Sequence, residues 1–264
     1  MARILPATSE ERGRGIHQRL FREADFFITN CTFFRDRAVA LGRPPEKAVV
    51  IGLPMDTGRF VLSKSRGPAD GHAVRLVAIG RLAEKRGFAD AVEAMALLAG
   101  EGRDVRLDIL GEGDCRLDPE ARNARAGLGD RVTPHGGASQ AEVIAALHRA
   151  DIALAPSLKA LSRDADAAVN TAKEAMATGL PGIATRHGGL PELVIPGEDG
   201  DLVPERDPSA LAAAIVRMMN DPLSWNAFGR SGRRKIIAEY GHRHILQRTL
   251  EACRTALTRA GETA

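Results

Sequence analysis

The sequence predicts an α/β protein built on a doubly wound parallel sheet, and three observations support this fold class. Short β-branched runs recur along the 264 residues, and most segments between them show helical spacing of apolar residues. Hydrophobic residues make up 44% of the chain and charged residues 27%, which is typical of a globular protein with a substantial core. Alternating strands and helices of this kind form parallel sheets with helices on both faces.

Seven β-branched runs are expected to be strands of a Rossmann-like sheet. They are residues 48–51, 75–79, 105–110, 131–133, 152–155, 182–185 and 201–203. The clearest helical spacing lies at Ala91, Met95 and Leu98, at Val143, Ile144 and Leu147, and at Leu211, Ile215 and Met218. A doubly wound sheet binds ligands beyond the carboxyl ends of its strands, so the loops that follow strands are where chemistry is expected.

Residues 1–46 differ from this pattern. They are basic between Arg12 and Arg22, and they hold five of the eight phenylalanines, which are Phe21, Phe26, Phe27, Phe33 and Phe34. Residues 25–29 predict a strand and residues 33–41 a helix that ends at Gly42 and the following prolines. One strand and one helix cannot form a domain alone. They either pack on the main sheet or end a domain whose beginning is absent, and the second case predicts an exposed apolar patch that favours self-association.

Three parts are therefore expected along the chain: residues 1–46, a main domain over 47–222, and C-terminal helices over 223–264. The C-terminal helices are indicated by apolar residues that recur between Trp225 and Leu250.

Composition and charge exclude several classes of protein. No apolar run approaches the roughly 18 residues of a membrane span, and residues 1–20 lack a signal-peptide core, so a cytoplasmic protein is expected. Cys31, Cys115 and Cys253 lack metal or redox spacing and are interpreted as free thiols. The net charge of +3 comes from residues 1–47, which indicates a solvated face or, at most, peripheral contact with an anionic membrane. Aromatic residues total 4%, which disfavours nucleic-acid binding.

The loop at residues 79–88 is the first candidate site. It follows an expected strand, begins an expected helix, and contains Gly80, Arg81, Lys85 and Arg86. Glycine lets a ligand approach the backbone, helix N–H groups point at the ligand, and the cations supply the charge that a diphosphate requires. The loop can thus be an anion cradle or only a solvated basic turn.

Two further loops follow expected strands. Gly111-Glu112-Gly113 is a G-x-G turn, and His135 precedes two glycines, where it can flank a nucleotide base or simply cap a strand. Asp166 precedes an expected helix over residues 169–178, and Glu174 lies over one turn inside it. Such a pair can hold sugar hydroxyls while the helix N–H groups bind a phosphate, or it can serve only as a cap and a surface carboxylate.

The order of these motifs resembles the C-terminal domain of family 4 glycosyltransferases, particularly the colanic-acid-type exopolysaccharide enzymes. The resemblance covers about residues 24–240. Its blocks are G-R-L-x-E-K-x-G at 80–87, G-x-G at 111–113, V-x-x-x-G at 132–136, A-P-S at 155–157, E-A-M-A-x-G-L-P at 174–181 and T-R-H-G-G-L-P-E at 185–192.

The resemblance implies a GT-B architecture with a remnant of the N-terminal domain, and a retaining enzyme that uses a UDP- or GDP-hexose without a metal or other cofactor. It implies that Arg81 and Lys85 or Arg86 hold the donor diphosphate, that Glu174 binds the ribose, and that Asp166 lies beside the transferred sugar. The nucleotide would also contact the turn residues and the start of the helix, namely Gly80, Gly111, Glu112, His135, Val169, Asn170 and Thr171.

Several departures from the family pattern keep alternatives open. Asp166 and Ala167 replace the first Glu-Gly of the family, Arg86 stands where Lys is usual, and Pro54 replaces a glycine of the linker. The resemblance also implies that most of the acceptor-binding domain, where the saccharide or lipid-linked acceptor would bind, is missing. The enzyme would then be either truncated or completed by a partner chain. A donor-binding part of a glycosyltransferase is the leading interpretation. A non-catalytic remnant or interaction module of the same fold is the alternative, and a sugar-nucleotide epimerase is a third that nothing in the sequence favours.

Overall fold

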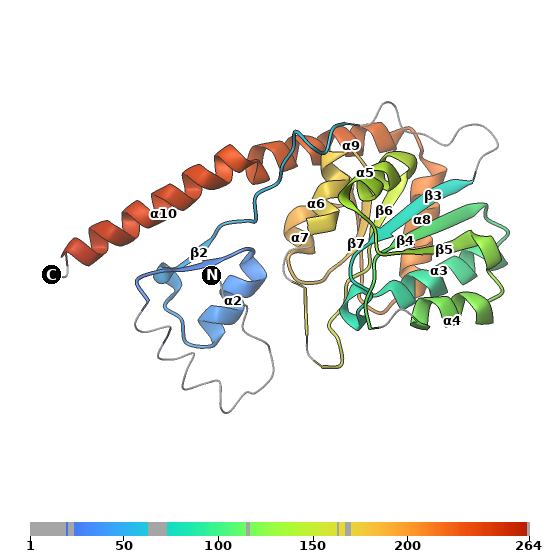
Figure 1. Ribbon diagram of the computed structural model, residues 1–264, viewed down its shortest axis with the longest axis horizontal. Coiled ribbons are helices and arrows are strands. Elements are labelled where there is room, and N and C mark those ends of the chain that lie inside the picture. Colours follow the sequence, from blue (N-terminus) through green and yellow to red (C-terminus); the bar gives the residue numbers. More distant parts are fainter. Residues whose placement is uncertain are drawn as a thin grey trace.

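A six-stranded, wholly parallel sheet forms the core of the larger part of the protein (Figure 1). The computed structural model describes residues 20, 24–62, 73–114, 117–162, 164–166 and 170–262. The strands are β3 (Val74–Ile79), β4 (Val105–Leu110), β5 (Val132–Gly136), β6 (Ile152–Ala155), β7 (Gly182–Thr185) and β8 (Gly200–Val203), in the order β5-β4-β3-β6-β7-β8. The predicted α/β fold with a doubly wound parallel sheet is confirmed.

Helices cover both faces of the sheet. One face packs against α3 (Phe88–Gly100) and α8 (Pro208–Asn220), with α4 (Leu117–Arg125) beside α3; the other packs against α5 (Gln140–Arg149), α6 (Asn170–Ala177) and α7 (Leu190–Leu193). The predicted apolar residues of α3 and α8 are buried against the sheet, as amphipathic helices require. Helix α5 begins with a capping box, in which Ser139 and Glu142 satisfy each other's backbone N–H groups.

The N-terminal lobe, residues 24–50, is a separate small unit. It contains β1 (Phe27–Thr29), α2 (Thr32–Ala40), the 3₁₀ turn η1 (Pro45–Lys47) and β2 (Ala48–Val50), and the two strands pair in parallel. The expectation that residues 48–51 join the main sheet is wrong, because the backbone of β2 pairs with β1 instead. Buried Arg43 supports this unit: its guanidinium lies 5.8 Å from the centre of the Phe27 ring and donates to the carbonyl oxygen of Ala24.

The C-terminal helices connect the two units. Helix α9 (Ser224–Lys235) buries Trp225 in the main core, and the short π-helix η4 (Ile236–Tyr240) leads to α10 (His242–Glu262). Figure 1 shows α10 running from the main sheet to the N-terminal lobe, where Arg248 Nη2 donates to the carbonyl oxygen of Val50 at 2.8 Å. Among the described residues, no helix has both the length and the apolar character needed to cross a membrane.

Several element boundaries differ from the expected ones by one to three residues, and one helix was not expected. Strand β5 starts at Val132 because Arg131 belongs to the 3₁₀ turn η3 (Gly129–Arg131), where its N–H donates to Leu128. Helix α6 ends at Ala177, since the N–H of Thr178 is shared between two carbonyl oxygens in a closing turn. Helix α4 was not expected, because its sequence has few apolar residues and contains a proline.

The strand order positions the candidate site. Strand β3 lies between β4 and β6, so the chain leaves β3 toward one edge of the sheet and later returns to its other side at β6. Loops after neighbouring strands diverge at such a switch point and leave a crevice beyond the carboxyl ends. The loops that follow β3 and β6 therefore face each other across this crevice.

Candidate functional site

Backbone hydrogen bonds join the loops that follow β3, β4 and β5. The N–H of Gly80 donates to Leu110, the N–H of Leu82 donates to Glu112, and the N–H of Gly111 donates to Gly136. Gly111 has a φ of 146°, and a Cβ there would lie 1.9 Å from the carbonyl oxygen of Gly80, so only glycine fits. The predicted residues Gly80, Gly111 and Glu112 thus lie along one rim of the sheet.

A second glycine brings the basic loop against the loop that follows β6. Gly87 has a φ of 65°, and a Cβ there would lie 1.8 Å from the carbonyl oxygen of Pro156. The N–H of Leu158 also donates to the carbonyl oxygen of Lys85 at 2.9 Å. Close approach at Gly87 therefore places Lys85 and Arg86 beside the loop that carries Asp166.

Lys85, Arg86 and Asp166 form an ion-pair cluster at this contact. Lys85 Nζ lies 3.4 Å from Asp166 Oδ1 and Arg86 Nε lies 3.2 Å from Asp166 Oδ2. Asp166 is 8% exposed, and the hydroxyl of Ser157 donates to its Oδ2 at 3.3 Å. Lys85 Nζ also lies 2.9 Å from the more exposed carboxylate of Asp164, which the sequence analysis did not single out.

Arg86 keeps a donor that no described residue uses. Its Nε is buried and within ion-pair distance of Asp166, but it forms no hydrogen bond with any residue that the structure describes. Because Nε is closed off from solvent, it pairs with Asp166 through charge and is not itself a contact point for a ligand. A phosphate oxygen is an acceptor of the kind that guanidinium groups prefer.

Side chains from other loops hold residues 157–162 and 164–166 in place. Glu205, after β8, accepts from the N–H of Lys159 at 2.8 Å, and Glu84, in the basic loop, accepts from the N–H of Leu161 at 3.0 Å. His187, after β7, accepts from the N–H of Asp166 at 3.0 Å. Sequence reasoning missed these anchors; for His187 the signal was its place in the T-R-H-G-G-L-P-E block directly after a strand.

Helix α6 carries three of the predicted residues. Asn170 is exposed at its first position, Thr171 is half-buried, and Glu174 is a half-buried carboxylate without a hydrogen bond or ion pair to the described residues. Burial raises the pKa of Glu174, and the neighbouring Lys173 ammonium opposes that shift. Val169 lies outside the described residues.

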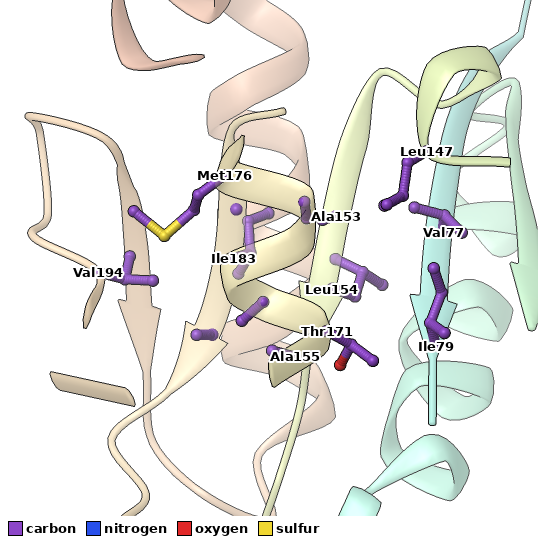
Figure 2. A pocket seen from close by; sticks show the side chains of 14 residues that line it. Val77, Ile79, Leu147, Ala153, Leu154, Ala155, Thr171, Met176, Ile183 and Val194 are labelled. Atoms are coloured by element: carbon purple, nitrogen blue, oxygen red, sulfur yellow. The ribbon is translucent and has the colours of Figure 1, made fainter. Parts of the chain in front are cut away.

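A small apolar cavity lies beneath α6 (Figure 2). Thr171 and Ile79 both line it, so the first turn of α6 and the end of β3 adjoin. Its volume of about 20 Å³ has room for a water molecule but not for a sugar or a base. This cavity is therefore too small to be the binding site of such a ligand.

Lys173 lies on the same helix and is buried, with 2% of its surface exposed. Its Nζ donates to the carbonyl oxygen of Leu53 at 2.9 Å and lies 5.1 Å from the centre of the Tyr240 ring. Burial lowers the pKa of Lys173 to about 8. The ammonium thus ties α6 to the linker that leads from the N-terminal lobe and to the C-terminal helices.

The remaining predicted residues do not bond to this cluster. Arg81 is exposed and makes no side-chain hydrogen bond or ion pair with described residues, and Glu174 and Asp166 are not bonded to each other. His135 is turned to its neighbouring strand, with Nε2 2.7 Å from Asp108 Oδ1. Over the described ranges, no three His, Cys, Asp or Glu side chains are grouped so that they could hold a metal ion.

Solved structures show the class of protein to which this fold belongs. The fold matches that of GT-B glycosyltransferases. Anabaena HepE in complex with UDP has a TM-score of 0.83 and 20% identity, over 96% of this chain and 70% of that chain. Sucrose-phosphate synthase from Thermosynechococcus elongatus has a TM-score of 0.79 and 25% identity, over 96% of this chain and 63% of that chain.

The family model described as "Glycosyl transferases group 1" matches residues 73–221, so the chain belongs to that family. A putative colanic acid biosynthesis glycosyltransferase, WcaL of Salmonella typhimurium, is 35% identical over 76% of this chain and 49% of its own length. The amylovoran biosynthesis glycosyltransferase AmsK of Erwinia amylovora is 32% identical over 89% of this chain and 57% of its own length. The chain thus spans about half the length of these curated relatives.

Proposed function

We propose that this chain is the donor-binding part of a retaining family 4 glycosyltransferase and binds a UDP- or GDP-hexose at the rim of the sheet. The observation that carries the proposal is the pair of cations at the switch point, Lys85 and Arg86, which converge on the buried carboxylate of Asp166. The family membership and the complex of HepE with UDP support it.

The proposed roles follow from charge and position. Lys85, Arg86 and exposed Arg81 hold the diphosphate and stabilise the negative charge that develops on it as the glycosidic bond breaks. Asp166, held by Ser157, lies beside the transferred sugar. Glu174 binds the ribose.

The other predicted residues complete the proposed nucleotide contacts. The backbone N–H groups at the start of α6 face the phosphates, since a helix N-terminus attracts anions. The nucleotide is expected to lie along the rim that carries Gly80, Gly111, Glu112 and His135, and over Val169, Asn170 and Thr171. No metal or other cofactor is required in this scheme.

We propose that the acceptor-binding part of the enzyme lies outside the residues that match the relatives. The relatives WcaL and AmsK are named for colanic acid and amylovoran biosynthesis, which supports a saccharide or lipid-linked acceptor. We propose that the part of such an enzyme that this chain does not match binds that acceptor. Transfer requires both substrates in reacting geometry, so a donor part alone loses an effect of roughly 7 to 11 kcal/mol. We place the protein in the cytoplasm, with at most peripheral membrane contact.

Calorimetric titration with UDP and GDP tests the proposal. The wild type is expected to bind one of them, and the double variant K85A/R86A is expected to bind it at least about 100-fold more weakly, since each charged hydrogen bond contributes about 1.5–3 kcal/mol. R217A is the matched control, because Arg217 is an exposed arginine on α8 that pairs with Asp201. Folded wild-type protein that binds neither nucleotide would overturn the proposal and favour the non-catalytic remnant.

A further inference from the structure

His187 lies at the end of a buried hydrogen-bond chain that reaches the candidate site. The residue is 3% exposed, its Nε2 accepts from the backbone N–H of Asp166 at 3.0 Å, and its Nδ1 lies 2.8 Å from Glu205 Oε1. A backbone N–H can only donate, so Nε2 must be unprotonated. Nδ1 therefore carries the proton and donates it to the Glu205 carboxylate, which fixes the tautomer of the imidazole.

Glu205 fixes the imidazole and the loop together. Its second oxygen, Oε2, accepts from the N–H of Lys159, which lies near the start of the segment that ends at Asp166. His187 accepts at the other end of that segment. One carboxylate and one imidazole thus hold both ends of the loop that carries the donor-site carboxylate.

The N-terminal lobe covers this imidazole. The ring of Phe33 lies 6.4 Å from the ring of His187, centre to centre. The carboxylate of Glu192 on α7 accepts from the N–H groups of Thr32 and Phe33 at 3.0 and 3.2 Å, so it caps the first turn of α2 and holds Phe33 there. The contact between lobe and sheet therefore falls on the residue that supports Asp166.

We propose that His187 is a positioning residue of the donor site: it holds the backbone of Asp166 so that the carboxylate stays paired with Lys85 and Arg86. This inference rests on the proposed function, because it assigns to His187 a role in binding the nucleotide sugar. Without an acceptor at Nε2, the buried N–H of Asp166 loses its hydrogen-bond partner. The loop then moves until this N–H finds another acceptor. The carboxylate then moves relative to both cations.

Two substitutions separate the hydrogen bond from packing. H187F keeps an aromatic ring against Phe33 and removes both nitrogens. H187Q loses the ring but can place an amide oxygen near the position of Nε2, so it restores an acceptor for the N–H of Asp166. H242F is the control for replacing histidine by phenylalanine, because His242 is exposed at the start of α10.

The first measurement is the affinity for UDP and GDP by calorimetry on the full chain. With the nucleotide that the wild type binds, H187F is expected to bind about tenfold more weakly, and H187Q and H242F within about twofold of the wild type. Equal affinity for H187F and the wild type would overturn the proposal. So would a loss in H187Q as large as in H187F, since packing of the ring would then be the cause.

The second measurement is hydrogen exchange at the Asp166 amide without nucleotide, which needs no donor binding. We expect exchange at least about tenfold faster in H187F than in the wild type, with protection restored in H187Q. If the wild type binds neither nucleotide while this pattern holds, the proposed function fails but the positioning of Asp166 by His187 stands. Unchanged exchange in H187F would refute the positioning itself.

Discussion

The two faces of the main sheet are built from different kinds of residue. Every buried side chain of α3 and α8 is apolar, from Phe88 to Leu98 and from Leu211 to Met218. The opposite face buries Lys173 on α6, Thr178 just after that helix, and Asp199 beside α9. Helix α6, whose first turn lies at the crevice, belongs to this second face, so the polar face is continuous with the candidate site.

This difference indicates a division of roles. The apolar face stabilises the fold without specific partners, because the free energy of burial depends on area more than on orientation. On the polar face each buried group needs a particular partner. The partners of Lys173 tie α6 to the linker and to the C-terminal helices, and the partner of Asp199 is on α9. Substitutions of buried residues on the two faces should therefore have different kinds of effect. Four experiments can test this difference.

The largest effect is expected at Asp199. Its carboxylate is 1% exposed, pairs with Lys235 Nζ, and accepts from the N–H of Ile195. D199A leaves the ammonium of Lys235, whose side chain is only 13% exposed, without its counter-charge and should lower the free energy of unfolding by about 3–5 kcal/mol. D201A, which breaks the exposed pair with Arg217, should cost less than about 1 kcal/mol. Urea denaturation measures the free energy of unfolding of both variants. Equal losses of stability in D199A and D201A would contradict the proposed difference between the faces.

The next effect tests the apolar face. Leu97 and Leu98 are neighbours on α3, with 44% and 1% of their surfaces exposed. L98A should lower the free energy of unfolding by about 3 kcal/mol through lost burial and a residual cavity, and L97A should stay within about 0.5 kcal/mol of the wild type. Nucleotide affinity of folded L98A should be unchanged. A loss of affinity would show that this face also shapes the site.

Local patterns predicted most of the main sheet. Strands β3 to β8 and helices α3, α5 and α8 could be predicted from the spacing of apolar residues. Apolar residues repeat about every two positions in a strand and every 3.6 positions in a helix, so the pattern is visible among residues close in the sequence. The pairing of β2 could not be predicted this way. Its short β-branched run looks like the strands of the main sheet, and only long-range packing on β1 and α2 decides its partner.

The site was predictable only in part, for the same reason. The motifs indicated Lys85, Arg86 and Asp166, and the structure pairs them. The support of Asp166 by His187, 21 residues away, depends on how β7 and the preceding loop approach each other. The burial of Lys173 depends on Leu53 and Tyr240, which lie far away in the sequence, so no local pattern shows it.

The free energy of unfolding should also depend on pH through Lys173, by less than the two effects described above. Burial lowers its pKa from 10.5 to about 8, so between these values the unfolded chain holds a proton that the folded chain has lost. The free energy of unfolding therefore rises with pH in this window, by up to about 1.4 kcal/mol per pH unit. Tyr240 beside it does not titrate in the folded chain there, because burial raises its pKa to about 12.

The matched variant for this effect is K173M, which fills similar volume without a titrating group. Between pH 8 and 9.5 the wild type should gain about 1–2 kcal/mol relative to K173M in urea denaturation. If the free energies of unfolding of the two proteins changed equally with pH, the ammonium of Lys173 would be solvated. Lys173 would then not be a buried cation of the polar face.

The smallest effect concerns Asp164, in the loop between β6 and α6. Its carboxylate pairs with Lys85 at 2.9 Å, but 56% of its side chain is exposed, so solvent screens the interaction. A diphosphate must compete with this carboxylate for Lys85. D164N should therefore bind whichever of UDP and GDP the wild type binds about two- to fivefold more tightly, with the gain shrinking as salt is added.

D130N, which removes an exposed carboxylate in η3, is the control for net charge. If D164N binds no tighter than D130N, Lys85 does not contact the phosphates, and Arg86 and Arg81 are left to hold the diphosphate.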